Sequence, residues 1–99
     1  MAYIIYQSPV YSRWFHSLRD LDAKRRIARR LDRFAQGNPG DVRPVGQGVS
    51  EIRLDHGPGY RIYYKQTGEV IFLLLCGGDK STQDRDIRSA LKMAKELPI

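Results

Sequence analysis

The sequence predicts an α+β domain: an N-terminal strand, a two-helix hairpin, a three-stranded antiparallel meander and a C-terminal helix. Four short runs are rich in β-branched and aromatic residues, and three longer segments repeat apolar residues at steps of three and four. Glycine- and proline-containing stretches separate many of these segments. With 99 residues, the whole chain (1–99) is expected to form one domain around a small core.

The first strand is expected in the run AYIIY, at 2–6. Two amphipathic helices follow, at 9–19 and 22–36, because the motif RDLD between them supplies aspartates that can cap the second helix. Gly37 is a natural end for that helix. The two apolar stripes consist of Trp14, Leu18, Leu21, Ile27, Leu31 and Phe34.

The stretch VRPVGQG is expected to be a loop that leads into three strands, at 49–54, 60–65 and 70–76. The short turns DHGPG and QTGE separate the strands, so two consecutive hairpins are the simplest connection. A last helix is expected from Thr82 to Leu97, with Ser81 and Asp84 spaced as a capping box. Its apolar face consists of Ile87, Ala90, Leu91, Ala94 and Leu97.

The charge composition points to an anionic partner. The net charge is +6, and the chain has many more arginines than lysines. Because the planar arginine fork pairs with phosphate through two hydrogen bonds, phosphate or another oxyanion is the expected ligand. No run is long enough to span a bilayer and no signal peptide is evident, so we expect a cytoplasmic protein with no membrane partner. The single cysteine, Cys76, lies in an apolar strand and is expected to be buried and inert.

One face of the predicted meander gathers charged side chains. Alternation along strand 49–54 places Glu51 and Arg53 together on a face that we expect to be open. A hairpin brings Arg61 beside Arg53, and Lys80 follows the next strand. The same residues also fit a solvent-facing cross-strand ion pair without catalytic function.

These side chains could cleave RNA without a metal ion. Such a reaction needs a base for the 2′-hydroxyl proton, cations for the charge of the phosphorane and an acid for the leaving 5′-oxygen. Glu51 could be the base, Arg53 and Arg61 the phosphate clamps, and Lys80 the electrostatic stabiliser or proton donor. His56 is an additional acid/base candidate, although a histidine in a turn is often only exposed. No metal-binding spacing and no cofactor motif is present, so neither is expected.

The motif GGDKST connects the last strand to the last helix. We interpret the glycines as permitting a turn that directs Lys80 to the same face as Arg61. Ser81 would cap the helix and direct its free N–H groups toward a phosphate. The alternative is an ordinary solvated turn.

The second helix carries four arginines opposite its apolar stripe. Such a row is either a solvated face or a binding surface for RNA, including ribosomal RNA. The four residues are Arg26, Arg29, Arg30 and Arg33.

The segments WFHSLRD, AKRRIARRLDRFAQGNPGDVRPVGQGVSEIRL, GPGYRIYY and LLLCGGDKSTQDRDI together resemble the addiction-module killer proteins of the RelE/HigB toxin group, within the wider RelE/ParE superfamily. The similarity covers most of residues 10–95. It implies a RelE-like fold and a ribosome-dependent endoribonuclease that cuts mRNA in the decoding site and arrests translation and growth. It also implies a cognate antitoxin, encoded beside the toxin and of the helix-turn-helix DNA-binding class.

The resemblance assigns the group's Gly-Tyr-Arg arginine to Arg61 and its paired basic positions on the preceding strand to Glu51 and Arg53. Glu51 departs from the pattern, because RelE has a lysine there. Lys80 matches the basic residue after the fourth strand, and His56 matches the HigB histidine loosely. RelE's late tyrosine has no counterpart, since residues 81–99 contain no tyrosine.

Two other functions fit the sequence. ParE-like members of the same superfamily poison DNA gyrase without cutting RNA, and such a protein needs only a complementary surface. A basic RNA-binding domain without activity is the third possibility, but the chain lacks an aromatic stacking platform typical of such domains. The convergence of a carboxylate with several cations favours the nuclease.

Overall fold

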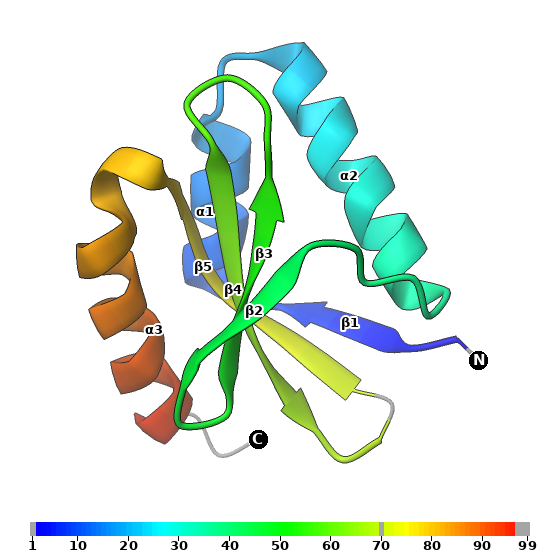
Figure 1. The fold of residues 1–99 in the computed structure, drawn as a ribbon, viewed down its shortest axis with the longest axis vertical. Helices are drawn as coiled ribbons and strands as arrows, with labels where there is room; N and C mark the ends of the chain where they lie inside the picture. Colours follow the sequence, from blue (N-terminus) through cyan, green and yellow to red (C-terminus); the bar gives the residue numbers. More distant parts are fainter. Residues whose placement is uncertain (1, 70, 97–99) are drawn as a thin grey trace.

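The computed structural model describes residues 2–69 and 71–96, which form a five-stranded sheet flanked by helices on both faces (Figure 1). The strand order is β1-β5-β4-β3-β2. In chain order the elements are β1 (Ile4–Gln7), α1 (Pro9–Ser17), α2 (Leu21–Ala35), β2 (Val42–Gly46), β3 (Val49–Leu54), β4 (Tyr60–Thr67), β5 (Ile71–Asp79), the 3₁₀ turn η1 (Lys80–Thr82) and α3 (Gln83–Glu96).

The predicted fold class is confirmed. Strands β3, β4 and β5 pair antiparallel in sequence order, as the two expected hairpins require. Strand β1 adds to the far side of β5 in parallel orientation and forms one edge of the sheet. Val70 and Leu97, which the sequence analysis assigned to a strand and to a helix face, lie outside the described residues.

One strand was missed. The stretch 42–46, expected to be a loop, is β2 and pairs antiparallel with β3 at the other edge of the sheet. Pro44 is compatible with this strand because one side of an edge strand needs no ladder hydrogen bonds. As a result Arg43 lies directly opposite Glu51 across the β2–β3 ladder.

The sheet is buried on both faces. Helices α1 and α2 cover one face, where Tyr11, Ile27 and Phe34 pack against strand residues. Helix α3 covers the other face through Ala90. The first part of strand β5 is apolar because it contributes to both cores: Phe72 and Leu74 to the first, and Leu73, Leu75 and Cys76 to the second. Leu21, predicted in the apolar stripe, is instead 64% exposed as the first residue of α2.

The helix ends follow local chemistry. Ser8 caps α1 by accepting from the Tyr11 amide, and Asp20 caps α2 in the same way. Gly37 adopts a φ of 95°, and the amides beyond α2 donate back to Phe34 and Arg33 in a Schellman motif. Within the described parts of the chain, no helix has the length and apolar character needed to cross a membrane.

Cys76 is buried between β5 and α3, and we expect it to be unreactive. Burial raises the pKa of its thiol from 9.0 to about 12, and the nearby Asp86 carboxylate adds to the shift. Because the thiol stays protonated well above neutral pH, a thiol-specific reagent at pH about 8 should label the protein only after unfolding. Rapid labelling of the folded protein would contradict this assignment.

Candidate functional site

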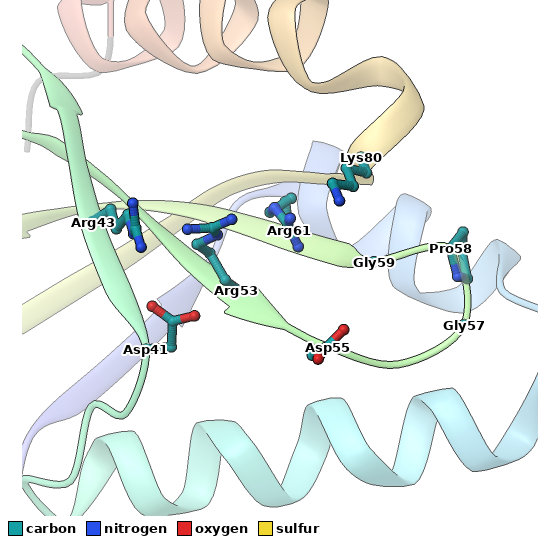
Figure 2. A pocket seen from close by; sticks show the side chains of 9 residues that line it. All are labelled: Asp41, Arg43, Arg53, Asp55, Gly57, Pro58, Gly59, Arg61 and Lys80. Atoms are coloured by element: carbon teal, nitrogen blue, oxygen red, sulfur yellow. The ribbon is translucent and has the colours of Figure 1, made fainter.

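Four cationic side chains surround a cavity of about 370 Å³. Figure 2 shows them in a row across β2, β3, β4 and the start of η1, with two carboxylates on the side nearer α2. The volume lies in the usual range for small-ligand sites. We call this the arginine cavity, and its lining residues are Asp41, Arg43, Arg53, Asp55, Gly57, Pro58, Gly59, Arg61 and Lys80.

The strand register explains why these side chains meet. Arg53 lies directly opposite Arg61 across the β3–β4 ladder, so both side chains leave the same face of the sheet. Gly78 is the partner of Arg61 on β5 and adds no side chain beside it. The predicted neighbourhood of Arg53, Arg61 and Lys80 is therefore present in the structure.

Arg61 is the most deeply buried cation of the cavity, with only 4% of its surface exposed. One of its Nη groups donates to the Tyr60 carbonyl at 3.0 Å, while its Nε has no hydrogen-bond partner among the described residues. A buried guanidinium with unused donors favours an oxyanion ligand, because charge-assisted hydrogen bonds are strongest away from water.

Glu51 is not on an open face, and this part of the sequence-based interpretation is wrong. The residue is 2% exposed because the start of α3 covers it, and its Oε2 accepts from the Gln83 side chain at 2.8 Å. Its Oε1 lies 3.7 Å from Arg53 Nε and 3.9 Å from Arg61 Nε. Glu51 therefore lies behind the two arginines as their shared counter-charge and does not line the cavity.

A buried tyrosine lies beside this carboxylate. Tyr63 is the cross-strand partner of Glu51 and is completely buried. Burial raises the pKa of its hydroxyl well above the usual value, and the negative charge of Glu51 adds to the shift. Tyr63 is thus a neutral, buried residue beside Glu51, behind Arg53 and Arg61.

The GG pair does not serve a turn, as we had expected, but lies within β5. A Cβ on Gly77 would collide with the Trp14 ring of α1, and a Cβ on Gly78 would collide with Asp86 of α3. Each glycine therefore permits a helix to approach one face of the sheet closely. The consequence for the site is that α3 begins directly beside Arg61.

The chain reversal before α3 is capped by Asp79, not by Ser81 as predicted. The Asp79 carboxylate accepts from both the amide and the hydroxyl of Ser81, and Thr82 completes the capping box. The Ser81 hydroxyl is thus committed to Asp79, and Ser81 does not line the arginine cavity. Lys80, immediately after the cap, does line it.

His56 is also outside the arginine cavity. Its Nε2 lies 3.6 Å from an oxygen of Asp20 and 3.6 Å from an oxygen of Asp22, at the start of α2. The histidine connects the β3–β4 loop to that helix, and this location does not support the predicted acid/base role. Its neighbours Asp55 and Gly57 do line the cavity.

The arginines of α2 separate into two groups. Arg26, Arg29 and Arg33 are exposed and border a shallow depression that shares Asp55 with the arginine cavity. Arg26 also pairs with Asp22 one helical turn earlier. Arg30 lines the same depression, but it is half-buried and its guanidinium donates to backbone carbonyls, so it is less free to bind RNA than the other three.

Three charged lining residues escaped the sequence analysis: Arg43, Asp41 and Asp55. Arg43 lay in the segment expected to be a loop. The alternation of Val42 and Arg43 next to strand β3 was the available signal for it. Within the described residues, no three His, Cys, Asp or Glu side chains come close enough to hold a metal ion.

The α+β fold is similar to that of RelE proteins of known structure. A solved structure of an arginine-to-alanine variant of the Escherichia coli toxin RelE, in the free state, aligns with a TM-score of 0.73 over 93% of this chain and 97% of that chain, at 17% identity. The toxin-antitoxin complex RelBE2 of Mycobacterium tuberculosis aligns with a TM-score of 0.55 over 81% of this chain and 100% of that chain, at 20% identity. The predicted RelE-like fold is confirmed.

Residues 13–97 match the family model of phage-derived Gp49-like proteins, and the chain belongs to this family. The chain is also 47% identical over 89 residues to a Haemophilus influenzae protein described as uncharacterized, and the aligned region covers 90% of each chain.

Proposed function

We propose that this protein is the toxin of a toxin-antitoxin system and acts as a metal-independent endoribonuclease on ribosome-bound mRNA. The observation that carries the proposal is the arginine cavity, in which Arg53, Arg61 and Lys80 converge. Arg61 lines the cavity and uses one Nη group on the Tyr60 carbonyl, so its other Nη group supports a phosphate ligand in particular. The RelE-like fold supports the same function by analogy.

The reaction is an attack of the ribose 2′-oxygen on the adjacent phosphorus. The O2′–P bond forms, the P–O5′ bond breaks, the 2′ proton leaves to a base and the 5′-oxygen receives a proton. Arg53 and Arg61 would hold the non-bridging oxygens, because fixed cations stabilise the charge that accumulates on the phosphorane. Lys80, exposed at the edge of the cavity, would protonate or electrostatically stabilise the leaving oxygen.

The base is better assigned to the cavity wall than to Glu51. Glu51 is enclosed behind the arginines, so a 2′-hydroxyl in the cavity has no direct path to it. Asp41 and Asp55 are the carboxylates that line the cavity. We assign proton abstraction to one of these two aspartates and a positioning role to Glu51.

The exposed arginines of α2 extend the cationic surface beyond the cavity. Arg26, Arg29 and Arg33 border a depression that adjoins the arginine cavity at Asp55. A phosphate backbone that enters the cavity could continue along this face, and ribosomal RNA would add further phosphates. This arrangement supports ribosome and mRNA as partners.

A cognate antitoxin encoded in the same operon is the second expected partner. We propose that it is a helix-turn-helix DNA-binding protein with an acidic segment that covers the arginine cavity. The net charge of +6 and the clustered cations favour such a segment over an apolar one.

Induction of the protein in cells tests the function. We expect growth arrest and new mRNA 5′ ends that follow the reading frame, with DNA supercoiling unchanged. Loss of supercoiling without mRNA cuts would indicate a ParE-like gyrase poison instead. RNA binding without either effect would indicate a non-catalytic RNA-binding protein.

Reversal of the charge at Lys80 should disable the site without unfolding the protein. Lys80 is exposed, so Lys80→Glu leaves the core unchanged while it places an anion beside the scissile phosphate. We expect ribosome-dependent cleavage to fall about 50-fold with an unchanged melting temperature. Lys92→Glu, at an exposed position of α3 that does not line the arginine cavity, is the matched control. Normal cleavage by folded Lys80→Glu would remove Lys80 from the mechanism.

A further inference from the structure

Arg30 donates hydrogen bonds to the backbone behind one wall of the arginine cavity. Its Nε donates to the Pro39 carbonyl at 3.1 Å, and its two Nη groups donate to the carbonyls of Arg53 and Asp41, each at 2.8 Å. Three of the five guanidinium N–H groups are therefore used inside the protein. Burial lowers the pKa of Arg30, whereas the Asp41 carboxylate opposes this effect.

These bonds converge on two residues of the arginine cavity. Asp41 and Arg53 both line it, and the Arg53 amide donates to the same Asp41 carbonyl at 3.0 Å. Arg30 thus fastens α2 to the chain before β2 and to the end of β3 at once. Its guanidinium also packs on Gly40, where an added Cβ would lie 2.8 Å from the guanidinium carbon.

We propose that Arg30 is a positioning residue that fixes Asp41 and Arg53, which are neighbours where β2 begins and β3 ends, in the wall of the arginine cavity. This inference rests on the proposed function and deepens it: Arg30 contributes to catalysis through the backbone rather than through contact with RNA. The planar fork of arginine reaches three carbonyls at once, which the single ammonium group of lysine cannot reproduce. A positive charge at position 30 is therefore not sufficient to hold the three carbonyls in place.

The test compares Arg30→Lys and Arg30→Ala with Arg25→Ala, which removes one exposed charge from the same helix. Hydrogen exchange of the Arg53 amide reports directly on the hydrogen bonds of Arg30, because that amide donates to the Asp41 carbonyl, to which Arg30 also donates. We expect both Arg30 variants to exchange this amide about tenfold faster, with no change at Tyr63 in the central strand β4. Arg25→Ala should match the wild type.

Kinetics on ribosome-bound mRNA separate positioning from RNA binding. For Arg30→Lys we expect kcat to fall about tenfold while KM changes little, because the RNA-facing charges remain and the cavity geometry is lost. A raised KM with normal kcat and normal Arg53 exchange would identify Arg30 as an RNA contact and overturn the proposal. Normal exchange and normal kcat in Arg30→Lys would overturn it as well.

The exchange measurement also keeps the two proposals apart. If the wild-type protein cuts no RNA, the proposed function fails, and the exchange of the Arg53 amide still decides whether Arg30 holds the wall of the cavity. If Arg30→Ala does not fold, Arg30→Lys carries the test.

Discussion

Arg61→Ala is expected to lower ribosome-dependent RNA cleavage at least about 100-fold, which corresponds to about 3 kcal/mol of transition-state stabilisation. Arg61 is 4% exposed and lines the arginine cavity, so its charge acts on a bound phosphate with little screening by water. Cleavage rates at saturating mRNA and growth arrest in cells are the two measurements. Arg19→Ala, which removes an exposed arginine between α1 and α2, should leave both unchanged.

Arg61→Lys separates charge from geometry at the same position. Lysine keeps the positive charge and most of the buried stem but loses the planar fork. We expect it to recover only part of the lost rate. A folded Arg61→Ala protein that cleaves at the wild-type rate would show that the arginine cavity is not the catalytic site.

Glu51→Ala is expected to destabilise the fold by about 3 to 5 kcal/mol, because it leaves two neighbouring arginines without their buried counter-charge. This is a large part of the total stability of a small domain. Urea unfolding followed by circular dichroism measures the change. Stability equal to that of the wild type would contradict the role of Glu51 as the shared partner of Arg53 and Arg61.

Glu51→Gln tests whether Glu51 is also a base. Glutamine keeps the side-chain volume and an oxygen that can accept from Gln83. If Glu51 only positions the arginines, this variant should fold and retain more activity than Arg61→Ala. Complete loss of cleavage in a fully folded Glu51→Gln protein would restore the catalytic assignment made from the sequence.

The sequence predicted β3 and β4, which carry Arg53 and Arg61, but it missed β2 with Arg43 and did not show how deeply the site is buried. Alternation along β3 and β4 correctly placed Arg53 and Arg61 side by side, because a hairpin fixes the register of adjacent strands. It could not show that α3 covers Glu51. The apolar character of β5 on both faces was the available clue, since it implies helices on both sides of the sheet.

The remaining errors arose where tertiary packing outweighs local patterns. Pro44 is compatible with a strand only because β2 forms an edge, which is a property of the whole sheet. Arg30 has the same helical spacing as the exposed arginines of α2, and only the path of the chain after the helix brings carbonyls within its reach. Periodicity therefore identified a basic face of the helix, but it did not distinguish Arg30, which is bonded to the backbone, from the exposed arginines.

The chemistry of the cleaved ends tests the central claim most directly. Purified protein is incubated with ribosomes that hold a defined mRNA, and the termini of the fragments are analysed. Attack by the 2′-oxygen predicts a 2′,3′-cyclic phosphate on the upstream fragment and a 5′-hydroxyl on the downstream fragment, with both absent when Arg61→Ala replaces the wild type. Intact mRNA, or fragments that carry a 5′-phosphate, would contradict the proposed reaction at the arginine cavity.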